Sequence, residues 1–371
     1  MKHLKLKKVV LIIILLLTGI FLIIQSYMLL APQFGRKPDK KRLEVLVKEA
    51  RYEKGKFHNR EDVPMMLPRS FGKLMKASRE NRKLRRPERP LPSVKPELGQ
   101  SLPEGSNSVT WLGHSTLIMQ VNGKLILTDP VFGKRASPVG FIGPKAFEFT
   151  DPILPGDLPE PDIILLTHDH YDHLDYRTIK KYYRNVKLFL VPLGVRDHLE
   201  RWGVDAEHII EFDWWQEKML SDGLTVIATP AQHFSGRRGQ NNSTLWCSWI
   251  VQTPKVKIFF SGDSGYNIHF AEIGERHGPF NLAFIECGAY GRYWPNIHMR
   301  PEESVQAALD VRTETAIPVH WGKYNLSFHP WEEPVELFIS NAAKWGLAYT
   351  IPKIGETLTI GETYPDEKWW R

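Results

Sequence analysis

The feature that most constrains this chain is an apolar segment that runs directly into a cluster of titratable residues. Residues 163–166 are a continuous apolar run, and LLTHDHYDHLD (165–175) then places three histidines and three aspartates within eleven positions. Charged groups at the boundary of a core are costly unless something compensates them. The regular H-x-H-x-D-H spacing therefore predicts that this segment binds metal ions.

The same arrangement, an apolar run that leads into a metal-binding side chain, recurs further along the chain. TPAQHF contains His233, KIFFSGD ends at Asp263, and TAIPVH ends at His320. Histidine nitrogen and aspartate oxygen suit Zn²⁺, and these ligand types also permit Fe or Mn. One tetrahedral ion needs fewer ligands than these, so we expect two ions that share a bridging carboxylate. The predicted ligands are His168, His170, Asp172, His173, His233, Asp263 and His320.

The pattern of strands and helices from residue 106 onward predicts two sheets covered by outer helices. Residues 108–132 alternate β-forming residues around Asn122-Gly123, which is a strong hairpin pattern. Helices are expected at 176–184 and at 301–312, where Pro and acidic residues begin the segment. The remaining expected strands are 162–168, 186–192, 225–234, 244–252, 255–266, 282–290 and 315–321. Hairpins followed by alternating strands and helices are typical of a layered α/β domain.

These motifs resemble those of the metallo-β-lactamase superfamily. The resemblance is closer to one branch, the N-acylphosphatidylethanolamine-hydrolysing phospholipase D family and its bacterial relatives. It covers roughly residues 106–335, and the matching stretches occur in the family's order: TWLGHSTLI, ILTDPVF, LLTHDHYDHLD, TPAQHF, FSGDSGY, IECGAY, the PEE of RPEES, and IPVHWGKYNLSFH. The resemblance implies an α/β fold, the αββα sandwich, with a dinuclear site at the sheet edge.

The resemblance also implies how the predicted ligands are divided between the two ions. It assigns His168, His170 and His233 to the first ion. It assigns Asp172, His173 and His320 to the second ion, with Asp263 bridging. Asp172 is also expected to take part in catalysis.

Further residues near the implied site each have a functional and a structural interpretation. Asp129 could orient a ligating imidazole through its second nitrogen, or it could form an Asp-Pro turn. For His114 we favour a structural hydrogen bond over direct catalysis. His298 matches a histidine beside the family's pocket and could act on the substrate as an acid, or it is a plain surface residue. Arg237 and Arg238 suit phosphate recognition, although solvated loop charges are the simpler interpretation.

The expected reaction is hydrolysis of a phosphodiester by hydroxide that the two metal ions activate. For an N-acylphosphatidylethanolamine the products are phosphatidic acid and an N-acylethanolamine. The alternatives are a lactone or ester hydrolase of a small soluble substrate, similar to the ascorbate-phosphate lactonases, and a non-catalytic envelope protein that retains the fold. A scaffold has no need of all the ligands, so we favour the enzyme.

The N-terminal third of the chain predicts attachment to a membrane. Residues 9–30 carry no charge and can cross a hydrocarbon core of ~30 Å as a helix. We favour an uncleaved single-pass anchor over a signal peptide, because the apolar stretch is long and SYMLLAPQF is a poor cleavage site. Lysines and arginines flank both ends of the span, so the side of the membrane that holds the domain is not determined.

The remaining predictions concern domain organisation, charge and cysteines. Residues 31–105 form a basic, Pro-rich extension with a short helix around 43–52, and residues 106–371 form the hydrolase domain. The net charge of +7 lies largely before residue 90, beside the apolar span, so we expect lipid contact rather than nucleic-acid binding. Cys247 and Cys287 show no metal-binding spacing, and two buried thiols are favoured over a disulfide.

Overall fold

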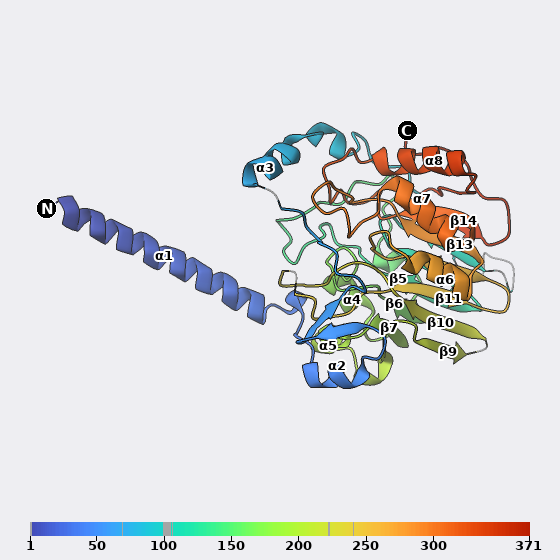
Figure 1. Ribbon diagram of the computed structural model, residues 1–371, viewed down its shortest axis with the longest axis horizontal. Helices are drawn as coiled ribbons and strands as arrows, with labels where there is room; N and C mark the ends of the chain where they lie inside the picture. Colours follow the sequence, from blue (N-terminus) through green and yellow to red (C-terminus); the bar gives the residue numbers. More distant parts are fainter. Residues whose placement is uncertain (1, 69, 99–104, 106, 222, 240) are drawn as a thin grey trace.

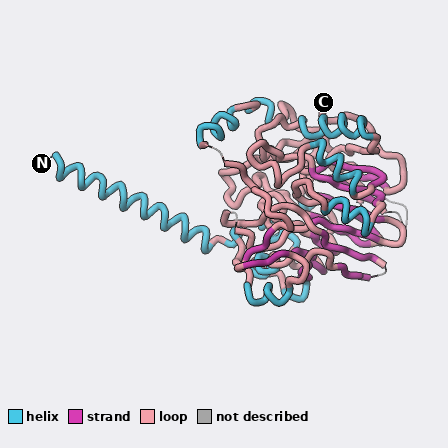
Figure 2. Tube along the Cα trace, in the orientation of Figure 1, coloured by secondary structure: helices cyan, strands magenta, loops and turns pink. Residues whose placement is uncertain are grey.

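The computed structural model of this chain describes residues 2–68, 70–98, 105, 107–221, 223–239 and 241–371. A long helix, α1 (Lys2–Leu30), projects from a body that contains both large sheets (Figure 1). Within the body, loops gather on the side toward α1 and strands lie toward the opposite side (Figure 2). Loops therefore make up much of the side of the body that faces α1.

The first large sheet has seven strands in the order β15-β3-β4-β5-β6-β7-β8. Strands β4 and β5 form the predicted hairpin, and both turn residues, Asn122 and Gly123, have positive φ (53° and 70°), as a type I′ turn requires. Strands β5 to β8 pair in parallel. The strand bounds are Ser108–Trp111 (β3), Leu117–Val121 (β4), Lys124–Thr128 (β5), Ile163–Leu165 (β6), Leu188–Pro192 (β7), Ile209–Phe212 (β8) and Thr357–Thr359 (β15).

The second large sheet has six strands in the order β14-β13-β12-β11-β10-β9. Strands β12, β13 and β14 pair in parallel, whereas β9 to β12 form an antiparallel meander. The carboxyl ends of parallel neighbours meet at one edge, which is where α/β proteins place their sites. The bounds are Glu217–Ser221 (β9), Leu224–Thr229 (β10), Ser248–Gln252 (β11), Lys257–Phe260 (β12), Phe280–Glu286 (β13) and Thr313–Val319 (β14).

The continuous apolar runs of the central strands arise because both faces of each strand are covered. In β6, Ile163 and Leu165 pack into the core between the sheets, and Ile164 packs into a second core on the outer face. Strand β7 divides in the same way, with Leu190 facing the inner core and Phe189 the outer core. Because successive side chains point to opposite faces, a strand that is buried on both faces has no polar positions.

Helices cover the outer faces of both sheets. Helices α4 (Tyr176–Tyr182) and α5 (Arg196–Arg201) supply Ile179 and Leu199 to the outer core of the first sheet. Helix α7 (Pro301–Asp310) lies on β13 and β14, between α6 (His269–His277) and α8 (Glu333–Trp345) (Figure 1). The predicted αββα sandwich is confirmed. The weakly patterned elements β8, β9, β15, α5, α6 and α8 were not anticipated from the sequence.

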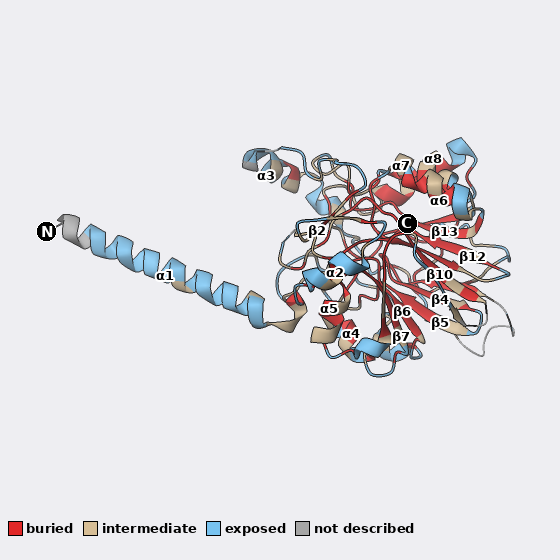
Figure 3. Cartoon of the chain, turned by 60° about the horizontal axis from the view of Figure 1, so that its bottom comes forward, coloured by how far each residue is buried: buried red, intermediate tan, exposed pale blue. Residues whose placement is uncertain are grey.

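Helix α1 stands apart from the body and its side chains are exposed along most of its length (Figure 3). Residues Leu6–Leu30 are long and apolar enough to cross a membrane, a criterion of length and composition that a signal sequence also meets. Only its end contacts the body, where Arg201 donates hydrogen bonds to the carbonyl oxygens of Leu29 and Leu30 (2.9 Å each). Helix α1 is therefore a candidate membrane span.

The extension after α1 packs on the body and includes α2 (Lys40–Leu46), β1 (Arg51–Glu53), β2 (Lys56–His58) and α3 (Phe71–Arg79). The predicted helix at 43–52 is wrong in extent. Asp39 caps α2 at its start, and the amides of residues 48–50 donate to the Asp213 carboxylate (2.5–3.0 Å) instead of continuing the helix. The predicted boundary at 105/106 adjoins residues 99–104 and 106, which lie outside the described residues.

The two cysteines are free and buried in the core between the sheets. Burial raises the pKa of both thiols well above their ordinary value. Cys247 and Cys287 are therefore buried free thiols, as favoured from the sequence.

Candidate metal centre

The predicted ligands converge because each follows the end of a strand at one edge of the sandwich. His168 and His170 follow β6, and His233 follows β10. Asp263 follows β12, and His320 directly follows β14. His320 also has a positive φ of 66°, a conformation that costs energy in a non-glycine residue and is found preferentially at functional sites.

One group of ligand candidates consists of His168, His170 and His233. The Nε2 atoms of His168 and His233 lie 2.9 and 3.2 Å from Nδ1 of His170. The outer nitrogens of the two buried rings are held in place, since Nδ1 of His168 contacts the Thr167 hydroxyl (3.0 Å) and Nδ1 of His233 contacts the Ile297 carbonyl (2.9 Å). Such contacts fix which nitrogen faces the centre.

The second group contains Asp172, His173 and His320, and it is richer in negative charge. Oδ2 of Asp172 lies 3.4 Å from Nε2 of each of the two histidines. On its outer side, Nδ1 of His173 contacts the buried Asp129 carboxylate at 2.8 Å, and Nε2 of His114 contacts Asp172 at 2.9 Å. Asp129 and His114 therefore hold the second group from behind, and neither is a surface residue.

Asp263 lies between the two groups. Its Oδ2 is 3.1 Å from Nε2 of both His173 and His320. The same oxygen is 3.8 Å from Nε2 of both His168 and His233. A single carboxylate that reaches ligand atoms of both groups has the placement that a bridging ligand requires.

The pKa values of the imidazoles differ between the two groups. Burial lowers the pKa of His168 and of His233 well below the ordinary value. Burial acts in the same direction on His320, yet Asp263 and Asp172 outweigh it and raise its pKa to about 10. His173 is likewise raised well above its ordinary pKa, because Asp263 and Asp172 overcome the effect of burial.

The donor set fits divalent metal ions. Four ligand atoms, from His168, His170, His233 and Asp263, lie within 4.8 Å of one another. Two buried polar atoms of these groups, Nε2 of His173 and Oδ1 of Asp263, make no hydrogen bond of acceptable geometry with the described residues, although Nε2 of His173 lies 3.1 Å from Oδ2 of Asp263. Buried polar groups without partners are rare and costly, and a cation among nitrogen and carboxylate ligands satisfies them.

His298 lies at the mouth of the centre rather than on a remote surface. Its Nδ1 contacts Oε2 of Glu286 at 2.9 Å, and the side chain is 12% exposed. Glu286 is fully buried at the end of β13 and also accepts from the amide of Met299 (2.8 Å). Within the described residues no hydrogen bond is found at Nε2 of His298.

Two residues of the centre were not anticipated from the sequence. Glu286 ends the apolar run LAFIE, the same pattern that identified Asp263, so that pattern could have found it. Asn59, in the extension, donates to the carbonyl of His233 and accepts from its amide (3.0 Å each). No local pattern relates Asn59 to a histidine so far along the chain.

Arg237 is not a solvated loop residue, and it is not placed for phosphate recognition. Its guanidinium is buried and donates to the carbonyl oxygens of Gln33, Asp169 and Leu174 (2.7–2.9 Å). It therefore ties the turn that follows α1 and its own loop to the segment that carries the candidate ligands. Both interpretations from the sequence were wrong for this residue, because neither accounts for burial.

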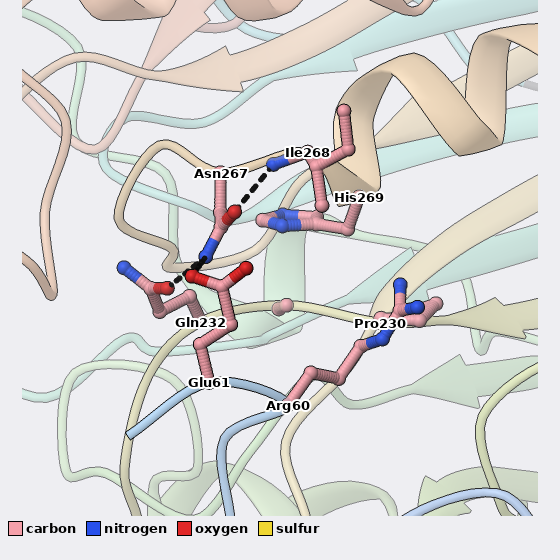
Figure 4. Close-up of a pocket in the computed structure, with 8 residues that line it drawn as sticks. Arg60, Glu61, Pro230, Gln232, Asn267, Ile268 and His269 are labelled. Carbon is pink, nitrogen blue, oxygen red and sulfur yellow. Dashed lines mark hydrogen bonds between the residues drawn. The ribbon is translucent and has the colours of Figure 1, made fainter. Parts of the chain in front are cut away.

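A separate small pocket of about 160 Å³ lies behind the loops that carry His233 and Asp263 (Figure 4). Asn267 connects its walls by donating to Gln232 (2.7 Å) and to Glu61 (3.1 Å), as the dashed contact to Gln232 shows. His269 contacts the Ser264 hydroxyl at 3.2 Å. These polar groups satisfy one another. Their hydrogen bonds link the loops that carry His233 and Asp263 from outside the centre.

Known proteins resemble this chain in sequence and in fold. The Beta-lactamase superfamily domain matches residues 124–321. Uncharacterized protein Rv0906 of Mycobacterium tuberculosis is 41% identical over 291 residues, 77% of each chain. N-acyl-phosphatidylethanolamine-hydrolyzing phospholipase D 1 of Caenorhabditis elegans is 36% identical over 259 residues, 63% of this chain and 72% of that protein. Igni18, a metallo hydrolase of Ignicoccus hospitalis, has the same fold (TM-score 0.53, 20% identity, 70% of this chain and 100% of that one).

The family match begins at β5 and ends one residue after His320, so it includes the candidate ligands of both groups. The family match and the phospholipase D relatives support a metal-dependent hydrolase, and the His/Asp clusters suggest that divalent metal ions bind here. This chain belongs to the metallo-β-lactamase superfamily, in the branch that includes the N-acyl-phosphatidylethanolamine-hydrolyzing phospholipases D.

Proposed function

We propose that this protein is a membrane-anchored hydrolase that uses two metal ions to cleave the phosphodiester bond of N-acylphosphatidylethanolamine-like phospholipids. The observation that carries the proposal is the convergence of two ligand groups on Asp263, in a chain that is 36% identical to a phospholipase D named for that substrate. The reaction releases phosphatidic acid and an N-acylethanolamine.

The ligand groups provide for two ions. His168, His170 and His233 would hold one ion, and Asp172, His173 and His320 the other, with Asp263 shared. Zinc is our first choice, and Fe or Mn suit the same ligands. When bound, such ions polarise a phosphoryl oxygen and lower the pKa of water to about 7.

The chain itself supplies a route for the proton that the leaving group needs. Attack of water on phosphorus breaks the bond to the alcohol, and the departing alkoxide must be protonated. His298 donates Nδ1–H to the buried Glu286 carboxylate, which orients the ring so that Nε2 faces away from Glu286. Its Nε2 then serves as the acid, and Glu286 is the positioning residue behind it.

Asp172 combines two roles in this proposal. Its Oδ2 faces His173 and His320, and it is fixed from behind by His114. It lies at the rim of the centre and is partly exposed (13% of its side chain). Asp172 therefore holds the second ion while it remains close enough to the opening to orient the attacking water.

Helix α1 would attach the hydrolase to a membrane. Leu6–Leu30 would insert as an uncleaved single-pass anchor, and the hydrogen bonds from Arg201 to the end of α1 would then hold the body close to the bilayer surface. A substrate that resides in the bilayer has only a short distance to move before it reaches a tethered hydrolase. This placement agrees with a phospholipid substrate.

The test is to purify the full chain in detergent and measure its metal content together with hydrolysis of N-acylphosphatidylethanolamine, a soluble phosphodiester and a lactone. We expect N-acylethanolamine release, and we expect His170→Ala and Asp172→Ala to lose metal and turnover together. His208→Ala is the matched control, because His208 is exposed and contacts only a backbone carbonyl and Glu207. Normal turnover in either ligand variant would refute the assignment.

A comparison of lipids in cells with and without the active protein tests the substrate. Accumulation of an N-acylated phospholipid when the protein is absent supports the proposal. An unchanged lipid profile beside altered sugar-phosphate esters would instead identify a hydrolase of soluble substrates.

A further inference from the structure

An exposed apolar loop tip lies next to the end of α1. Phe141 and Ile142 are 78% and 61% exposed, although large apolar side chains are normally withdrawn from water. A pocket of about 280 Å³ is lined both by this loop and by Tyr27 and Gln33, from the last turn of α1 and the residues after it. The tip and the end of the candidate membrane span therefore belong to one surface.

The loop is held in shape by its own hydrogen bonds. The Arg135 guanidinium donates to the carbonyl oxygens of Gly140 and Gly143 (3.2 and 2.6 Å). The backbone pairs below the tip, with the Ala146 amide donating to Lys134 (3.0 Å). A tip that is already ordered loses little conformational freedom when it binds, so the apolar side chains are presented for contact.

The surface around the tip is basic. Lys134 and Arg177 are exposed beside the loop, and Arg135 adds a third positive charge. Asp175 is the only acid among the described residues that line this pocket, and its carboxylate is occupied by the start of α4. Positive side chains around an apolar tip match the chemistry of an anionic lipid surface.

The same surface continues into the segment that carries the candidate ligands. Tyr171 and Asp175 line the pocket and belong to LLTHDHYDHLD. The Tyr324 hydroxyl donates to the carbonyl of Gly133 at 2.6 Å, which joins the base of the loop to the segment that follows His320. Contact of this surface with lipid would therefore bring the metal centre to the bilayer.

We propose that the docking surface, formed by the tip residues Phe141 and Ile142 with Lys134, Arg135 and Arg177, inserts into and binds an anionic bilayer beside α1. Helix α1 contacts the body only near its end among the described residues, through the hydrogen bonds from Arg201 to Leu29 and Leu30. The docking surface is a second contact that turns the ligand segment toward the lipid. This inference rests on the proposed membrane insertion of α1.

In the experiment, an environment-sensitive fluorophore is attached to the cysteine that F141C introduces into the full chain. The matched control is M219C, since Met219 is 70% exposed and lies on β9, far from α1 in Figure 1. The native cysteines are buried and remain unlabelled under native conditions. Each labelled protein is reconstituted into phosphatidylcholine vesicles with and without phosphatidylglycerol, and flotation verifies that the full chain is held by the vesicles.

We expect the label at residue 141 to shift its emission to shorter wavelength and to be quenched by brominated acyl chains, most strongly when phosphatidylglycerol is present. The label at residue 219 should show neither effect. Adding K134Q and R177Q should remove the dependence on phosphatidylglycerol. A label at residue 141 that stays as exposed to water as the control would overturn the docking surface, and a chain that does not float would overturn the anchor and the docking surface together.

A second measurement separates docking from the proposed reaction. F141S/I142S should lower turnover of an N-acylated phospholipid in vesicles several-fold and leave turnover of a micellar short-chain analogue unchanged. Equal losses on both substrates would contradict docking. The fluorescence readout needs no turnover, so insertion of the tip in a protein that does not cleave phospholipid would support docking and contradict the proposed substrate.

Discussion

The two halves of the candidate metal centre differ in charge although they contain similar side chains. The half built from His168, His170 and His233 contains only imidazoles, and burial lowers the pKa of each. The other half includes Asp172 and lies against the Asp129 carboxylate, and it holds two histidines whose pKa values are raised. The same residue type therefore favours the neutral form in one half of the candidate centre and the protonated form in the other half.

This difference indicates how the two sites compete with protons. A metal ligand must be deprotonated, so a histidine with a lowered pKa binds metal without losing a proton near neutral pH. A histidine with a raised pKa must release its proton first. The carboxylates that attract a second cation are thus also the groups that retain protons when the cation is absent.

The largest expected effect comes from the residue that joins the halves. Asp263→Asn should weaken retention of both ions and lower kcat/KM by about 10³-fold, because the shared carboxylate reaches ligand atoms of both groups. Metal content and turnover of the purified protein are the measurements. Asp366→Asn, on the exposed surface, is the control. Retention of both ions in the Asp263 variant would show that the halves are independent.

A smaller effect, strongest in the carboxylate-rich half, is expected from Asp129→Asn. Its carboxylate holds Nδ1 of His173 at 2.8 Å and fixes which nitrogen faces the centre. Loss of such a contact typically costs about 10–100-fold in metal affinity or activity. Titration with a chelator should show that the variant loses the ion assigned to Asp172, His173 and His320 at a lower chelator concentration than the unmodified protein does. An equal loss of both ions would contradict a role centred on His173, because Asp129 also reaches His168 through the Thr167 hydroxyl.

The pH dependence of metal loading tests the difference in charge directly. His320 has a pKa of about 10 in the metal-free protein and His173 is raised as well, so both carry protons at neutral pH. Binding of the second ion should release protons, and its affinity should fall about tenfold per pH unit for each proton released as the pH is lowered. Calorimetry in buffers of different ionisation enthalpy counts these protons. Two ions that bind with no proton release would contradict the assignment of charge.

The smallest effect is expected from the extension, through the imidazole-only half. Asn59→Ala removes the two hydrogen bonds to the backbone of His233 and should cost about 1 kcal/mol of stability per bond, with a modest decrease in affinity for the first ion. Thermal unfolding with and without metal measures both. Asn341→Ala, on the exposed side of α8, is the control. If Asn59→Ala changed neither the unfolding temperature nor metal binding, the extension would serve only to connect α1 to the body.

Sequence patterns were informative where one local rule sufficed. The strand runs, the Asn122-Gly123 hairpin and the histidine-rich segment follow from alternation, turn chemistry and ligand spacing, and each is found in the structure. The helix expected at 43–52 ends early because Asp213 captures its amides. Glu286 ends an apolar run, the same pattern that marks Asp263, whereas no local pattern marks Asn59.

The sequence by itself determined the layered α/β fold, the family and the chemical nature of the ligand groups, because periodicity and ligand types are properties of short segments. Only the tertiary structure decided which carboxylate lies between the two groups, which residues hold the ligands from behind, and that Arg237 is buried. The physical reason is that pKa values, hydrogen bonds and burial depend on neighbours that the fold brings together from distant parts of the chain.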